Sequence, residues 1–272
     1  SNITAFFRNR SFLCSILYSV DRGKAEVDAL ILNGGFLMDY NNYDRGYAEP
    51  SMSASDYMTR TYRWMAGGLL VTFAMAYITA TTSLIYLVNS LYFLLTIGEL
   101  ALVFMLSARV QKMSIDGARA AFFGYAILNG MVLSYYFLMF SVGTLVMAFL
   151  ATAVYFGLMA VYGTTTHKDL TGWGPRLMMA LVAMIVTSLV GALFGFGFGT
   201  SVLYCGIGLV VFMLLTAYDT QKLRQIYAYY AGDAELAEKA SIYGALTLYL
   251  DFINIFLYVV RLLGMNSRSR NN

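Results

Sequence analysis

The fold is decided by residues 241–264, which read SIYGALTLYLDFINIFLYVVRLLG. The run is long enough to cross a bilayer, because a membrane-spanning helix needs about 20 apolar residues. Its only charged residue before Arg261 is Asp251. A carboxylate at bilayer depth is costly, so either this run is not a membrane span or Asp251 has a function there.

Composition favours a membrane protein. Hydrophobic residues make up 59% of the 272 residues and charged residues 12%, whereas soluble domains carry about 25% charged residues. The formal net charge is only +3, and the basic residues fall mostly between the apolar runs. This pattern suits loops that face anionic lipid and gives no reason to propose nucleic-acid binding. The two cysteines predict neither a disulfide framework nor a metal site.

The N-terminal region differs from the rest of the chain. Residues 1–37 lack the long apolar core of a signal peptide or a span. Gly34-Gly35 shortly before Met38 is how a ribosome-binding site reads when it is translated in frame. We therefore expect residues 1–37 to be a translated upstream leader, disordered and without function, and residues 38–60 to be a polar cytoplasmic tail.

Seven apolar runs are candidates for membrane spans. They lie at about residues 64–80, 92–108, 118–140, 144–162, 176–198, 202–221 and 242–263. The connections between them are too short to form a soluble domain. We expect one all-helical membrane domain over residues 61–265, followed by a basic C-terminal tail at 266–272.

The distribution of Lys and Arg predicts a cytoplasmic N-terminus, because cytoplasmic loops are enriched in basic residues. The predicted connections at 81–91, 141–143 and 199–201 contain no Lys or Arg, whereas the alternate connections do. Seven crossings would then place the basic C-terminus outside. Either the last segment is re-entrant, or it crosses inside a ring of six helices. We favour the second, because a short basic tail can be translocated.

The last span has one polar face. On a helix, residues at steps of three and four share a face, and this face carries Gly244, Thr247, Asp251, Asn254, Tyr258 and Arg261. A polar stripe within a span turns toward the bundle interior or toward water. We therefore expect a central helix whose stripe lines an internal cavity.

A second carboxylate, Asp219, stands near the end of the sixth run. The apolar spacing continues through Leu223, Ile226 and Tyr230, so this helix is expected to extend to about residue 230, which places Asp219 at the depth of Asp251. Two carboxylates in contact share a proton over some pH range, and when ionised they are ligands for a hard cation such as Ca²⁺. The alternative is that Asp219 caps or snorkels near the surface while Asp251 only forms hydrogen bonds inside the bundle.

Two further groups are candidates. Glu99 is an acid well inside the second span, either functional or bonded to a neighbouring helix. Arg109, at the predicted cytoplasmic end of the same span, is either a counter-ion for the two aspartates or an ordinary basic anchor.

The motifs AYDTQKL (217–223) and YGALTLYLDFINIFLYVVRLLG (243–264) resemble those of the Bax inhibitor family, also called the Lifeguard or transmembrane Bax-inhibitor-motif family, in its bacterial branch. The resemblance covers about residues 58–265. It implies seven helices with the last one in the centre, and a pH-sensitive Ca²⁺ leak whose aspartate sensor would be Asp219 and Asp251. An arginine at the end of the second span also belongs to that sensor, and Arg109 matches it to within about one residue.

Two functions follow. The first is a pH-gated cation leak channel of the bacterial inner membrane, with Asp219, Asp251 and Arg109 as sensor and gate. Glu99, Thr247, Asn254 and Tyr258 would line or support its pore. The second, also implied by the resemblance, is a non-transporting regulator that binds a membrane-bound ATP-dependent protease or a stress-response partner. An aspartyl protease is disfavoured because the second motif lacks glycines around Asp251. We therefore expect no enzyme activity and no cofactor.

Overall fold

The computed structural model describes residues 52–109, 112–194 and 201–270. These residues form helices and their connections, with no strand among them. The predicted leader (1–37) and most of the predicted tail (38–60) lie outside the described residues. In chain order the helices are α3 (Ala54–Thr81), α4 (Leu84–Arg109), α5 (Ile115–Met139), α6 (Val142–Thr165), the 3-10 helix η2 (Thr171–Trp173), α7 (Gly174–Leu193), α8 (Val202–Tyr230) and α9 (Ala234–Arg270).

Capping side chains determine where five of these helices begin. The hydroxyls of Ser53, Ser114, Ser141 and Ser201 each accept a hydrogen bond from the backbone N–H three residues later, at 3.0 to 3.2 Å. Asp233 does the same for α9, accepting from two backbone N–H groups at 2.9 and 3.0 Å. Such caps satisfy N–H groups that have no partner within the helix, so each serine or aspartate marks a helix start in the sequence.

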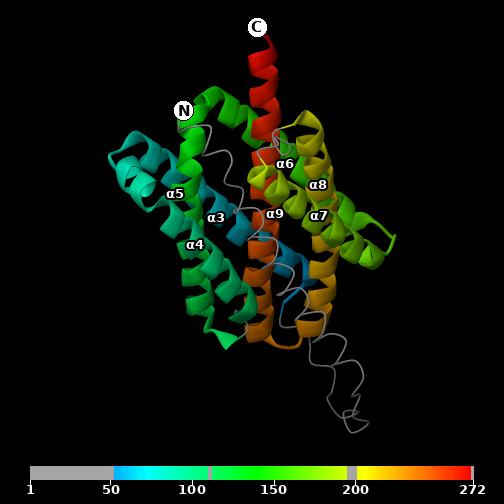
Figure 1. Ribbon diagram of the computed structural model, residues 1–272. Helices are drawn as coiled ribbons and strands as arrows, with labels where there is room; N and C mark the ends of the chain where they lie inside the picture. The colour runs from blue at the N-terminus through cyan, green and yellow to red at the C-terminus, as the bar shows by residue number, and fades with distance from the viewer. Residues whose placement is uncertain (1–51, 110–111, 195–200, 271–272) are drawn as a thin grey trace, which may run out of the picture.

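The C-terminal helix α9 passes through the middle of the bundle (Figure 1). Every position from Ala237 to Val260 is buried. Its main neighbours are α3, α5, α6 and α8, while α4 packs chiefly on α5 and α7 chiefly on α8. The C-terminal helix is therefore central, as predicted. Its inner layer consists of four helices, and the predicted ring of six around it is not confirmed.

Five helices are long and apolar enough to cross a membrane, namely α3, α5, α6, α8 and α9. A sixth span is obtained if the two segments of α4, Leu84–Tyr92 and Ile97–Val103, count together, although they are inclined at 78° to each other. The predicted fifth span, 176–198, continues past the end of α7 into residues outside the description. The described residues thus support five or six spans, and the seventh stays a prediction.

The prediction of a connection over residues 81–91 was wrong. α3 ends at Thr81 and α4 begins at Leu84, so most of that stretch is helical. It contains no Gly or Pro to interrupt a helix, and only its threonines and Ser83 form the turn. Asn89 within this stretch accepts a hydrogen bond from the Tyr135 hydroxyl of α5 at 2.7 Å. A polar residue that bonds to a neighbouring helix does not interrupt its own helix.

α9 is one continuous helix of 37 residues. Its C-terminal end lies at the opposite end of the bundle from the α8–α9 connection (Figure 1). A last segment that crosses the membrane inside the bundle requires a continuous helix. A re-entrant last segment would instead need a break in that helix. The helix also includes residues 266–270, which the sequence analysis assigned to a separate tail.

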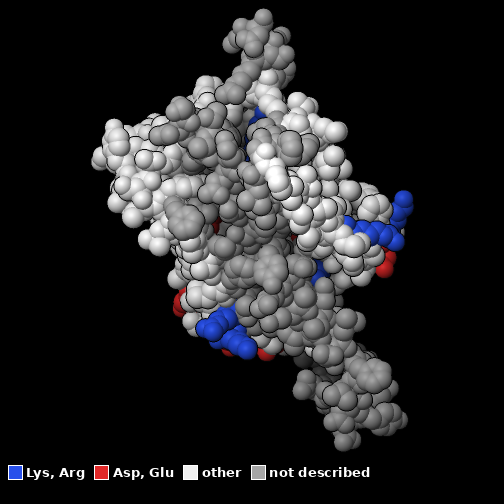
Figure 2. All heavy atoms as spheres, viewed as in Figure 1, with Lys and Arg blue, Asp and Glu red and all other residues white. Residues whose placement is uncertain are grey.

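The start of α3 and the α6–α7 connection meet α8 and the start of α9 at one end of the bundle. Arg60 of α3 bonds to Glu238 of α9. Tyr227 of α8 bonds to residue 52, and Gln221 of α8 bonds to the α6–α7 connection. Most of the face shown in Figure 2 is uncharged, with Lys and Arg confined to small groups. Many large apolar side chains are exposed along the helices, as contact with lipid requires. That the charged end faces the cytoplasm stays a prediction.

Candidate functional site in the α8–α9 interface

Two glycines define how α8 and α9 align as antiparallel neighbours. A Cβ atom on Gly208 would lie 2.4 Å from the ring of Tyr258, and one on Gly244 would lie 2.5 Å from the side chain of Leu223. In this alignment Asp219 lies level with about residue 247, and Asp251 lies level with about residue 216. The two aspartates are therefore about one helical turn apart along the bundle, ~6 Å.

Both aspartates are buried. The exposed fraction is 2% for Asp219 and 5% for Asp251. α8 continues to Tyr230, as predicted, so Asp219 lies well inside the helix and not at its exposed end. The alternative of a surface-snorkelling Asp219 is therefore wrong. The structure brings the two carboxylates to the same helix pair and within one turn of each other.

The rest of the predicted stripe is buried in the same interface. Thr247 donates to the carbonyl of Tyr243 at 3.2 Å, and the Asn254 amide donates to the carbonyl of Leu250 at 2.8 Å. The Asn254 carbonyl oxygen is buried without a hydrogen-bond partner. Burying such an oxygen costs free energy, because its hydrogen bonds to water are lost and no protein group replaces them. A bound ligand or water that interacts with the oxygen removes that cost. The Asn254 oxygen is thus an acceptor left over for a cation or a water.

Tyr258 closes the stripe toward the C-terminal end of α9. Its ring packs on Phe212 of α8 with centroids 5.9 Å apart, and the Arg261 guanidinium lies 5.8 Å from its centroid. Arg261 also donates to the Tyr136 hydroxyl of α5 at 3.2 Å. These contacts fill the space beside the stripe, and neither of two pockets found among the described residues includes a stripe residue.

Glu99 is 1% exposed and faces α5. The side chains of Tyr125 and Asn129 lie beside its carboxylate, although neither Glu99 oxygen has a hydrogen-bond partner within 3.5 Å. Asn129 donates to the Tyr125 hydroxyl at 3.2 Å. A buried carboxylate beside a hydroxyl and an amide is consistent with a structural role against a neighbouring helix and equally with a role in a pore. The role of Glu99 in a pore stays a prediction.

A chain of hydroxyls continues from this acid toward α3. The Tyr125 and Tyr249 rings are 5.7 Å apart, and the Tyr249 hydroxyl lies 2.6 Å from the Thr72 hydroxyl. Thr72 is also 2.9 Å from the carbonyls of Gly68 and Ala126. Because the single Thr72 proton goes to a carbonyl, Tyr249 must donate to Thr72. The Thr72 hydroxyl thus joins α3 to α5 and α9 by polar contacts, and Tyr125 and Glu99 lie beside them.

Arg109 lies exposed at the end of α4, and no ion pair of the described residues includes it. Its role as counter-ion stays a prediction. Sequence reasoning missed a nearer cation, Lys222, which is only 8% exposed and lies 6.0 Å from the Tyr218 ring centroid. Lys222 follows Asp219 by three residues, so the two share a face of α8. That spacing was visible in the sequence, but Lys222 was interpreted only as a loop charge.

A second cluster missed by sequence reasoning lies at the charged end of α9. Glu238 accepts hydrogen bonds from Arg60 of α3 and Arg119 of α5, each at 2.8 Å. Arg119 also lies 5.1 Å from the Trp64 ring centroid and bonds to Asp116 at 3.2 Å. One carboxylate therefore ties the start of the central helix to two surrounding helices.

The site offers oxygen donors only in small number. The described residues contain no group of three or more His, Cys, Asp or Glu that could hold a metal. Asp219 and Asp251 together with the Asn254 carbonyl are hard donors suited to brief Ca²⁺ contact, as in permeation, and not to a resident ion with six to eight ligands.

Comparison with known proteins identifies the family. The family profile described as inhibitor of apoptosis-promoting Bax1 matches residues 54–268, which is nearly all of the described bundle. The chain belongs to the Bax inhibitor family. The resemblance noted in the two aspartate motifs is thereby confirmed.

Several bacterial members of the Bax inhibitor family are similar over most of their length. The inner membrane protein YbhL of Escherichia coli is 40% identical over 222 residues, covering 79% of this chain and 94% of YbhL. An uncharacterized protein of Deinococcus radiodurans is 43% identical over 210 residues, with coverages of 76% and 89%. YrjE of Lactococcus lactis is 33% identical over 222 residues, with coverages of 79% and 93%. With the apolar helices, these relatives support a multi-pass protein of the inner membrane.

Proposed function

We propose that the protein is a cation leak channel, permeable to Ca²⁺, whose opening depends on the protonation of Asp219 and Asp251. The observation that carries the proposal is the burial of both carboxylates on the neighbouring helices α8 and α9, at depths about one turn apart, with Asp251 on the helix around which the bundle packs. Family membership supports a membrane protein of this class.

The mechanism is a change in repulsion between the two acids. When the pair holds a proton, one carboxyl can donate to the other and α8 and α9 pack closely. When both are ionised, like charges in a medium of low dielectric constant repel, and the pair becomes a binding site for a cation. Because α9 is buried on all sides, a shift of α9 against α8 is transmitted to the surrounding helices.

The experiment is Ca²⁺ flux into liposomes holding the purified chain, measured across pH. Asp219→Asn with Asp251→Asn keeps the shape of both side chains but removes the exchangeable proton. We expect flux that no longer changes with pH. Asp116→Asn is the matched control, because the Asp116 side chain is 92% exposed and lies outside the interface. Unchanged flux and pH dependence in the double variant would contradict the gate.

A second function is favoured by the close packing of the same interface. Tyr258 fills the space over Gly208, and α9 is buried from Ala237 to Val260. A bundle packed in this way suits a non-transporting regulator of a membrane-bound ATP-dependent protease or stress-response partner. In that case liposomes show no Ca²⁺ flux at any pH, and co-purification with the partner survives the double Asn substitution.

A further inference from the structure

A pocket of about 530 Å³ opens at the charged end of the bundle, away from the aspartate pair. Three elements form it: the start of α3, the connection between α6 and α7, and the last turns of α8. The residues that line it are Ala54, Met58, His167, Lys168, Asp169, Gln221, Arg224, Gln225, Tyr227 and Ala228. This volume falls within the range of small-molecule sites, and the sequence analysis assigned no role to any of these residues.

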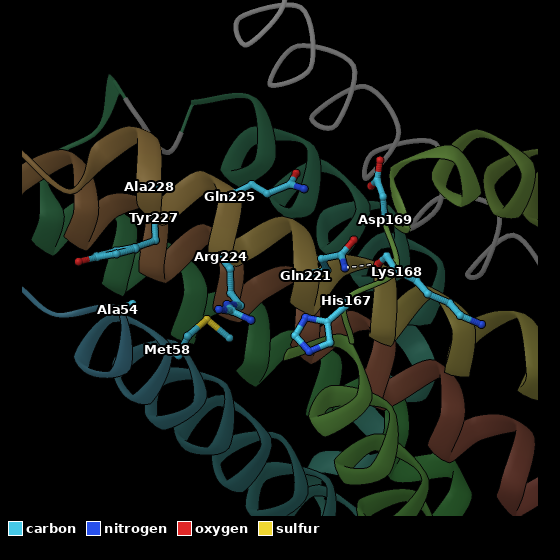
Figure 3. Close-up of a pocket in the computed structure, with 10 residues that line it drawn as sticks. All are labelled: Ala54, Met58, His167, Lys168, Asp169, Gln221, Arg224, Gln225, Tyr227 and Ala228. Carbon is cyan, nitrogen blue, oxygen red and sulfur yellow. Dashed lines mark hydrogen bonds between the residues drawn. The ribbon is translucent and has the colours of Figure 1, made fainter. Parts of the chain in front are cut away.

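The wall on the α8 side carries donors that are held in place. One guanidinium nitrogen of Arg224 donates to the carbonyl of Thr164 at the end of α6. Because a guanidinium has five N–H groups in a rigid fork, the others remain available. Figure 3 shows the Arg224 guanidinium and the His167 ring directed toward the same space beside Met58.

The opposite wall is fixed by one glutamine. Gln221 of α8 accepts from the backbone N–H of Leu170 and donates to the carbonyl of Lys168, both at 2.8 Å. These two bonds use both ends of the amide and hold the connection against α8 (Figure 3). His167 and Lys168 are therefore presented by a loop whose backbone is already ordered, which lowers the entropy lost on binding.

The charge of the pocket is positive. Lys168 and Arg224 are permanent cations, and Asp169 is the one carboxylate among the described lining residues. The Asp169 carboxylate is turned away from the other polar groups in Figure 3. It accepts from the backbone N–H of Thr171 at 2.8 Å, and hydrogen bonds from Thr171 lower the pKa of Asp169 below its ordinary value. Asp169 thus caps its own turn and does not neutralise Arg224.

We propose that this pocket binds a phosphate group, held by Arg224 and His167. A planar guanidinium beside an imidazole suits phosphate oxygens. The Lys168 side chain extends away from these two groups in Figure 3 and adds positive charge at the rim. The apolar side chains of Met58 and Ala54 leave room for the carbon part of the ligand. The phosphate belongs either to the headgroup of an anionic phospholipid or to a soluble phosphate ester.

Binding there joins three elements. Gln221 and Arg224 already bond α8 to the α6–α7 connection and the end of α6, and Tyr227 bonds α8 to Met52 before α3. Gln221 is two residues from Asp219, so a ligand that stiffens this turn of α8 also stiffens the α8 side of the aspartate pair. The pocket is nevertheless a separate site. Phosphate binding can be measured whether or not the chain conducts cations.

The test uses the full chain in a neutral detergent and two probes, measured by titration calorimetry. The probes are a short-chain phosphatidylglycerol and glycerol 3-phosphate, with short-chain phosphatidylcholine as the neutral lipid. Lys168→Gln with Arg224→Gln removes both cations, and we expect binding at least about tenfold weaker, because the variant loses the charged Arg224 donor and the positive charge of Lys168 at the rim. The matched control is Arg63→Gln with Arg176→Gln, which removes two exposed cations outside the pocket and should leave the affinity within about twofold of the wild-type value.

Asp169→Asn is expected to increase the affinity for the phosphate probe, which a misfolded variant could not do. The amide oxygen can still accept from Thr171, but the negative charge is gone, so binding should tighten by up to about fivefold. Binding of phosphatidylglycerol alone identifies a lipid headgroup as the source, and binding of glycerol 3-phosphate identifies a soluble ester; both support the proposal. The proposal is overturned if the wild-type chain binds neither probe, if phosphatidylcholine binds equally well, or if the two double variants lose affinity to the same extent.

Discussion

Removing the Glu238 carboxylate should destabilise the bundle far more than removing the carboxylate one turn earlier on the same helix. Glu238 accepts two charged hydrogen bonds at 2.8 Å, and its side chain is 8% exposed. Glu235 makes one ion pair, with Lys239 at 2.6 Å, and its side chain is 65% exposed. The two glutamates thus differ in burial and in the number of helices they join.

The magnitude follows from these contacts. A hydrogen bond to a charged group contributes about 1.5 to 3 kcal/mol when desolvated. The arginine side chains are 50% and 37% exposed, so each bond is discounted to about 1 kcal/mol. Glu238→Ala should therefore cost roughly 2 kcal/mol. Glu235→Ala removes a single pair within one helix, four residues apart, whose carboxylate side chain is 65% exposed, and should cost at most about 0.5 kcal/mol.

The assay is thermal unfolding in detergent, followed by circular dichroism. For a chain of this size a change of 1 kcal/mol shifts Tm by about 2 to 4 °C. We expect Glu238→Ala to lower Tm by about 4 to 8 °C and Glu235→Ala by less than about 2 °C. Arg60→Ala combined with Glu238→Ala should cost less than the two single changes added. Equal shifts for the two glutamates would refute the assignment of Glu238 as the residue that ties α9 to α3 and α5.

Two further predictions, each with a control variant, use the same unfolding measurement. Gly163→Ala should lower the free energy of unfolding by about 1 to 3 kcal/mol, because the added Cβ would lie 2.3 Å from the Ala217 carbonyl of α8. On the same helix, the Cβ of Gly157→Ala would meet nothing within 4 Å. That control should be neutral or should stabilise the fold by up to about 1 kcal/mol. Thr72→Val should cost about 1 to 2 kcal/mol, since it leaves the buried Tyr249 hydroxyl without its acceptor. Thr187→Val removes only an exposed bond to its own helix and should cost less than about 0.5 kcal/mol; a loss as large as that of Thr72→Val would count against the hydroxyl chain.

The parts of the fold that were predicted correctly depend on patterns within one helix. The spacing of apolar residues beyond Gln221 predicted that α8 continues to Tyr230, and the stripe containing Asp251 predicted a central α9. The start of α4 was missed because residues 81–91 were interpreted as a connection between two apolar runs, whereas Asn89 in that stretch bonds to Tyr135 of another helix. Polarity alone does not distinguish a loop from a helix position that bonds to a neighbour.

In the candidate site, too, residues that stand out within one helix could be predicted, and clusters formed by several helices could not. Asp219 and Asp251 could be predicted because each stands out within its own apolar run. The Glu238 cluster could not, because Arg60, Arg119 and Glu238 come from three helices that are far apart in sequence and only packing brings them together. The phosphate pocket is a similar case. His167 and Arg224 face each other only because Gln221 holds the α6–α7 connection against α8.

The packing of α9 against α8 limits how α9 can move in the proposed gate. If α9 slides against α8, Gly208 must pass under the Tyr258 ring, where a single methyl group already has no room. A gate that slides by a full turn would therefore have to separate the two helices first, whereas a rotation or tilt of α9 that changes the distance between Asp219 and Asp251 would not. Rotation or tilt is thus the motion that the packing of this interface permits.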